Sequence, residues 1–207
     1  MKGLLLKDWY MTKKYCRSYL FITVLFFAFY LFEPNNTFCL VYPCVFASMI
    51  PSTLFGYDEK ARWLEYCGTL PVKKEQIVSV KYIYLLIIVV VMSALTVIVQ
   101  LIQMSMAGEV VVSEIFETID AELIASAVVS CISLPMMFKL GVEKARVVYY
   151  IMIGLSIAVL MVVTSISAYE PELAETVNVD LIAILATIVL YAVSWYLSIA
   201  FYKKREI

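Results

Sequence analysis

The sequence predicts an all-α integral membrane protein with six transmembrane helices, both termini in the cytoplasm, and a single membrane domain over residues 1–207. Of the 207 residues, 63% are hydrophobic and 16% are charged, whereas about a quarter of residues are charged in soluble domains. The charged residues are also bunched between long apolar stretches instead of alternating with apolar residues at helical spacing. Both observations favour membrane spans, and the placement of Lys and Arg predicts their orientation.

Uncharged stretches mark the expected transmembrane helices, because a span needs about 20 mostly apolar residues. They cover residues 18–32, 37–57, 82–108, 123–138, 147–169 and 181–202. The first and fourth stretches are short, so by length alone each is compatible with a re-entrant or interfacial segment. Charge placement favours full crossing, because removing the fourth span would put Lys139, Lys144 and Arg146 outside the cell.

The distribution of basic residues predicts the orientation of the bundle. With six crossings, all 16 Lys and Arg residues fall on one side, within residues 1–17, 58–81, 139–146 and 203–207. The other side receives acidic residues and no Lys or Arg, at residue 33 and within 109–122 and 170–180. Basic residues are retained in the cytoplasm during insertion, so the first set of segments is expected to be cytoplasmic. The outer connections are short, and any activity is therefore expected in the membrane or at its inner face.

The N-terminal segment, residues 1–17, has two interpretations. Leu5, Trp9 and Thr12 lie along one side of a helix, and basic residues are available to anionic lipid headgroups. This pattern suits an interfacial helix. The alternative is a basic flank that only fixes the topology.

The 56–81 loop predicts a short cytoplasmic helix. Asp58 suits the N-cap and Gly68 the C′ position, and the charged residues between them form i,i+3 and i,i+4 pairs. Aromatic residues lie opposite these charges. The helix therefore either offers a surface to a partner or merely joins two spans with its aromatic residues on headgroups. The residues expected to contact a partner are Asp58, Glu59, Lys60, Arg62, Trp63, Glu65 and Tyr66.

The third span carries a polar stripe on an otherwise apolar helix. It consists of Ser93, Thr96, Gln100 and Gln103, at positions i, i+3, i+7 and i+10. This stripe either lines a substrate cavity or bonds to a neighbouring helix, for which the serine face of the fourth span is a candidate. That face consists of Ser126, Ser130 and Ser133.

Several functional classes are disfavoured by absent residues. The chain has no His, and its five Cys residues lack CxxC spacing, so neither a zinc site nor a Ser-His dyad is expected. It has no GxxxxGK[ST] loop, so it is not expected to hydrolyse ATP. No ionisable residue lies deep in a predicted span, which disfavours secondary transport. We therefore expect neither an enzyme nor a bound cofactor or metal.

The run DEKARWLEYCGTLPVKKEQIVSVKYI resembles the cytoplasmic loop of bacterial ABC-2-type transporter permeases. The opening MKGLLLKDW and the closing YKKRE are similar to the same group, particularly to the small permeases of phenol-soluble modulin exporters. Cys67 and Gly68 depart from the bulkier apolar residues expected there. The resemblance covers essentially the whole chain, and it implies a multi-pass protein of the bacterial plasma membrane.

The resemblance also implies a function and partners. It implies that residues 58–68 form the coupling helix, which inserts into a groove of a separate subunit that binds ATP and Mg. It further implies that two six-span permeases pair around the translocation route, and that amphipathic or hydrophobic substrates, such as cytotoxic or antimicrobial peptides, are exported. The alternative is a membrane scaffold or immunity protein that sequesters a toxin without turnover.

Overall fold

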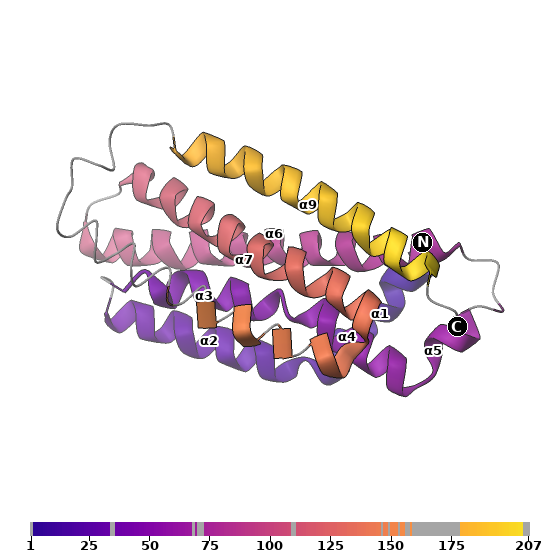
Figure 1. Ribbon diagram of the computed structural model, residues 1–207. Helices are drawn as coiled ribbons and strands as arrows, with labels where there is room; N and C mark the ends of the chain where they lie inside the picture. Colours follow the sequence, from indigo (N-terminus) through magenta and orange to yellow (C-terminus); the bar gives the residue numbers. More distant parts are fainter. Residues whose placement is uncertain are drawn as a thin grey trace.

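The computed structural model describes residues 2–33, 36–67, 69, 73–108, 111–145, 147–148, 150–152, 154–155, 158 and 179–204, and the regular structure within them is helical. Figure 1 shows long helices running side by side, with both termini at the same end. The helices are α1 (Lys2–Tyr15), α2 (Arg17–Phe32), α3 (Phe38–Ala47), α4 (Ile50–Lys60), α5 (Trp63–Cys67), α6 (Lys74–Ala107), α7 (Val112–Leu140) and α9 (Val179–Lys204).

Within the described residues, four helical stretches are long and apolar enough to cross a membrane. They are Phe38–Lys60, which joins α3 to α4, Lys74–Ala107, Val112–Leu140 and Ile184–Lys203. α1 and α2 form a fifth candidate that is bent by 67°. The prediction of an all-α, multi-pass membrane protein is confirmed at this level. Six spans and cytoplasmic termini stay predictions, and the span predicted at 147–169 lies largely outside the described residues.

The second predicted span is a broken helix. α3 ends at Ala47 and α4 begins at Ile50, with Pro51 in its first turn. Proline has no N–H to donate, and its ring clashes with the carbonyl group four residues earlier in a continuous helix. The chain therefore turns at Ser48 and Met49 before the helix resumes.

The fourth predicted span begins much earlier than expected. α7 starts at Val112, so most of the segment assigned to an outer loop, 109–122, is helical. Its acidic residues suggested a loop, but they belong to a helix, on which Glu114 and Glu117 are exposed and Glu122 is buried. The preceding helix α6 ends at Ala107, and the next residue, Gly108, has a φ of +83° and donates its N–H to the Met104 carbonyl. This left-handed conformation is accessible to glycine at little cost and terminates α6.

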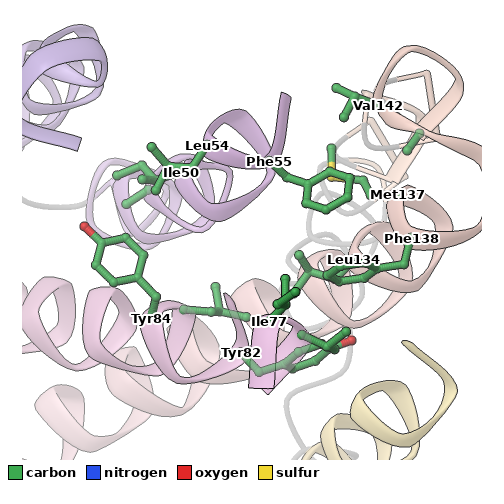
Figure 2. Close-up of a cluster of buried hydrophobic side chains, with 14 of the residues drawn as sticks. Ile50, Leu54, Phe55, Ile77, Tyr82, Tyr84, Leu134, Met137, Phe138 and Val142 are labelled. Atoms are coloured by element: carbon green, nitrogen blue, oxygen red, sulfur yellow. The ribbon is translucent and has the colours of Figure 1, made fainter. Parts of the chain in front are cut away.

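Aromatic and aliphatic side chains from α4, α6 and α7 fill the main core, as Figure 2 shows. Phe55 contacts Phe138 edge to face, with ring centres 4.8 Å apart, and Phe138 contacts Tyr202 of α9 at 5.5 Å. Such pairs contribute about 0.5–1.5 kcal/mol beyond their buried area. This core holds α4, α6, α7 and α9 together at the end that carries the termini.

Hydrogen bonds also connect the long helices. The Tyr82 hydroxyl lies 2.7 Å from the hydroxyls of Ser194 and Ser198 of α9, and Ser194 donates to the Cys131 carbonyl of α7 at 2.7 Å. In lipid, small polar residues of this kind join neighbouring helices. The five cysteines are all buried free thiols.

Candidate functional site

Four charged side chains meet at the end of the bundle that carries the termini. Lys81 Nζ donates to both carboxylate oxygens of Asp8 and to Asp58 Oδ2, each at 2.9 Å. Lys7 Nζ donates to Asp58 Oδ1 at 2.6 Å and lies 3.4 Å from Asp8 Oδ1. We call Lys7, Asp8, Asp58 and Lys81 the four-charge cluster. It connects α1, α4 and α6, which converge at this end in Figure 1.

The four-charge cluster is almost shielded from solvent. Asp8, Asp58 and Lys81 are 1%, 4% and 3% exposed. Burying an isolated charge costs several kcal/mol, so these groups are stable there only as a paired set. The two carboxylates and two ammonium groups balance, and each carboxylate contacts both lysines. Removing any one member leaves an unbalanced charge inside the protein.

The predicted capped helix at 58–68 is wrong in its boundaries. α4 continues to Lys60, so Asp58 lies inside a helix and within the four-charge cluster instead of at an N-cap. A turn follows at Ala61 and Arg62, where Arg62 has a φ of +52°, and α5 then covers only Trp63–Cys67. The buried lysines stabilise Asp58 more than an i,i+4 pair with Arg62 would, because such surface pairs contribute about 0.5 kcal/mol at most. Gly68 lies outside the described residues.

Trp63 connects the short helix α5 to the four-charge cluster. Lys7 Nζ lies 4.6 Å from the centre of the Trp63 ring, a cation–π contact, and the Tyr66 ring lies 5.5 Å from Trp63. Burial raises the pKa of the neighbouring Cys67 thiol, and the positive charges of Lys7 and Lys81 oppose this effect. The remaining predicted contact residues of this segment are exposed, namely Lys60, Arg62, Glu65 and Tyr66.

Glu59 connects the end of α4 to the segment that follows α7. Its Oε2 atom accepts a hydrogen bond from the Val142 N–H at 3.0 Å. A cleft of about 360 Å³ lies beside this contact and carries charges of both signs. It is lined by Gly56, Glu59, Lys60, Leu140, Gly141, Val142, Glu143 and Lys144. Four of the predicted contact residues are exposed beside this cleft or on the neighbouring turn and α5, Glu59 and Trp63 are half-buried, and Asp58 is buried in the four-charge cluster.

The sequence reasoning missed Lys7, Asp8 and Lys81. The sequence did indicate a role for Lys81, because it directly precedes a long apolar run. A lysine at that position needs an acidic partner if its helix is buried against others. Nothing in the sequence indicated which acid would be that partner.

The polar stripe of α6 faces α7. Thr96 Oγ1 lies 2.6 Å from Glu122 Oε1, and Gln100 Nε2 donates to Thr118 Oγ1 at 3.4 Å. Ser93 and Gln103 are half-buried. We call Ser93, Thr96, Gln100, Thr118 and Glu122 the α6–α7 polar seam.

The α7 residues that bond to the polar stripe of α6 are not the predicted serines. Ser126 and Ser133 donate to backbone carbonyls of their own helix, whereas Thr118 and Glu122 bond across to α6. The structure also places one ionisable residue, Glu122, within a helix that is a candidate span, where the prediction expected none. Glu122 is 0% exposed inside α7, because this helix begins before the predicted boundary.

An apolar pocket opens between α6, α7 and α9, one helical turn from the polar seam. Its volume is about 340 Å³, and its lining is almost entirely hydrocarbon. It is lined by Leu85, Leu86, Val89, Leu123, Ile124, Ser126, Ala127, Ile184, Thr187, Ile188 and Tyr191.

Comparison with known families decides the class of this membrane protein. A family model described as ABC-2 family transporter protein matches residues 3–203. The chain belongs to this family. Neither the search of curated proteins nor the search of solved structures finds a match.

Membership in the ABC-2 family identifies the chain as a membrane component of an ABC transporter and implies an ATPase partner. It agrees with the predicted resemblance to ABC-2 permeases and with the multi-pass helices. The narrower resemblance, to phenol-soluble modulin exporters, stays a prediction.

Proposed function

We propose that this ABC-2 protein is the permease subunit of a bacterial plasma-membrane exporter driven by a separate ATP-binding subunit. The observation that carries the proposal is the four-charge cluster. Through Asp58, the cluster connects the end of α4, which precedes Trp63, to α1 and to the first turns of α6. A force applied to α5 is therefore transmitted to a helix long enough to cross the membrane.

The ATP-binding subunit would dock on the exposed surface of this end. Lys60, Arg62, Glu65 and Tyr66 supply exposed charges and an aromatic ring, and the cleft beside Glu59 adds a concave polar surface. Charged and aromatic residues together suit a reversible interface, because charges steer association and buried aromatic rings supply affinity. ATP and Mg would be bound, and ATP hydrolysed, on that partner, with no catalytic role for this chain.

The apolar pocket supports a proposed substrate class. An opening between α6, α7 and α9 that is lined by hydrocarbon suits amphipathic or hydrophobic molecules, for which cytotoxic or antimicrobial peptides are the proposed case. Pairing with a second permease, identical or paralogous, would enclose the route between two bundles.

The test reconstitutes the chain with its cognate ATP-binding subunit in lipid and measures ATP hydrolysis and substrate efflux. Trp63→Ala and Glu59→Lys should lower both toward the level of the ATP-binding subunit alone, because each breaks a contact of the loop segment. Trp9→Ala is the control, since Trp9 is likewise a tryptophan with a lysine, Lys13, at 5.1 Å from its ring, but it lies exposed on α1. It should leave both rates unchanged.

The alternative function is a membrane scaffold or immunity protein that sequesters a toxin. It predicts that adding the wild-type chain leaves ATP hydrolysis unchanged, and that all three variants behave alike. That result would overturn the proposed function.

A further inference from the structure

The α6–α7 polar seam contains a carboxyl group that has no cationic partner among the residues that the structure describes. Glu122 is 0% exposed, and within the described part of the chain its Oε2 atom has no hydrogen-bond partner. Gln100 Oε1 in the same seam also lacks a partner among the described residues. Ser93 borders the same carboxyl group.

The sequence offers no basic residue to neutralise Glu122. There is no Lys or Arg between residues 18 and 59, between 82 and 138, or between 147 and 202. Along α6, Thr96 is 15 positions from Lys81, or about 22 Å at about 1.5 Å per residue. An ionised carboxylate buried in lipid-embedded protein without a counter-charge is strongly disfavoured and takes up a proton instead.

The two contacts of the Thr96 hydroxyl are compatible with a protonated Glu122. Thr96 Oγ1 lies 3.2 Å from the Met92 carbonyl oxygen and 2.6 Å from Glu122 Oε1. A hydroxyl group carries one hydrogen, and a carbonyl oxygen can only accept. If Thr96 donates to Met92, the short contact needs a hydrogen on Glu122 Oε1, which then donates to Thr96.

We propose that Glu122 is a proton-binding site within the membrane domain, occupied at neutral pH. A proton taken from water forms an O–H bond at Oε1, and this group donates to Thr96. The neutral carboxyl allows α6 and α7 to stay in contact beside the apolar pocket, which Leu123 lines. Loss of the proton would leave a charge in the seam and draw water between the two helices. This inference is independent of the proposed export function.

The groups around the seam reinforce proton uptake. α6 supplies only neutral polar side chains, and α3 supplies Cys44, a thiol within electrostatic range of Glu122. α9 supplies Tyr191 at the adjacent pocket. The charged residues of α4 lie in its last turn, where Asp58 belongs to the four-charge cluster, Glu59 accepts from Val142, and Lys60 lines the cleft. The other acids of α7 can only add negative charge. They are Glu114, Glu117 and Asp120.

The test is infrared spectroscopy of the full-length protein in lipid nanodiscs, which separates the carbonyl stretch of a protonated carboxyl group from the stretches of a carboxylate. The wild-type protein should show a carboxylic-acid band at neutral pH that Glu122→Gln removes and the exposed control Glu117→Gln retains. Thr96→Val should shift the band, because it removes the hydroxyl partner. This third variant keeps the test decisive if Glu122→Gln does not fold.

Two outcomes would overturn the proposal. The first is the absence of the acid band in the wild-type protein at neutral pH. The second is a band that appears only when sodium is replaced by choline, which would assign the site to a metal cation instead of a proton.

Discussion

Replacing Lys81 by Met tests the four-charge cluster directly. The variant keeps a side chain of similar length but removes three hydrogen bonds of 2.9 Å and leaves two carboxylates beside a single lysine. Breaking a buried ion pair by removing one partner costs about 3–5 kcal/mol. Lys7 remains, and its side chain is 22% exposed, so water and Lys7 together relieve part of the excess charge. We therefore expect a loss near the lower value, about 3 kcal/mol.

Thermal unfolding in detergent or nanodiscs measures this loss. For a chain of this size, about 3 kcal/mol corresponds to a decrease in Tm of about 10 °C. The matched control is Lys203→Met, which breaks the ion pair with Glu75, where the two side chains are 54% and 50% exposed. An exposed pair contributes about 0–1 kcal/mol, so Tm should change little. Equal Tm changes in the two variants would refute the assignment of the cluster as a buried, structural network.

A double variant separates charge balance from packing. Adding Asp8→Asn to Lys81→Met restores a neutral set, in which Lys7 still pairs with Asp58 at 2.6 Å. The double variant should therefore be more stable than Lys81→Met alone, and the coupling energy from the cycle measures the interaction of the two residues. Simple addition of the two single effects would show that the charges do not interact.

Three further predictions concern other parts of the chain. Gly108→Ala should lower stability by about 1–2 kcal/mol in thermal unfolding, since a φ of +83° strains a side-chain-bearing residue although the added methyl group meets no neighbouring atom. In a variant with Cys67 as the single cysteine, maleimide should react more slowly than in one with Thr69→Cys as the single cysteine, and equal rates would contradict the burial of Cys67. The rate at Cys67 should increase with pH, because burial raises the pKa of its thiol and the thiolate is the reactive form. Membrane-impermeant maleimide applied to intact cells should label Glu117→Cys but not Lys144→Cys, and labelling of the latter would reverse the predicted orientation.

The membrane class and the family could be predicted from the sequence because each depends on the residues of continuous segments and not on contacts between distant ones. Long uncharged runs identify helices that lipid can accommodate, and the loop motif around Trp63 carries the family resemblance. Helix ends were less predictable. The acidic first turns of α7 were interpreted as a loop, because composition does not show that one face of a charged helix, including Thr118 and Glu122, is buried.

The four-charge cluster could not be predicted because its members are distant in sequence. Lys7 and Asp58 are 51 positions apart, and Asp8 and Lys81 are 73 apart. The local pattern offered Asp58 a plausible partner in Arg62, and the tertiary fold offered it two buried lysines instead. The tertiary partners prevail because a desolvated charge-assisted hydrogen bond is stronger than an exposed i,i+4 pair.

The two polar sites lie on one continuous helix, and this gives them a physical relationship. Lys81 in the four-charge cluster and Thr96 in the polar seam both belong to α6, which runs from Lys74 to Ala107 without an internal proline. A continuous α-helix of this length resists bending because its backbone hydrogen bonds are satisfied along the whole segment. A displacement imposed on Lys81 through α4 and α5 would therefore tilt or translate α6 as a unit. Such a movement would separate Thr96 from Glu122, and an unpaired polar group is costly in lipid. Under the proposed function, the short contact between Thr96 and Glu122 is therefore a position at which movement of α6 relative to α7 would depend on the charge of a single carboxyl group.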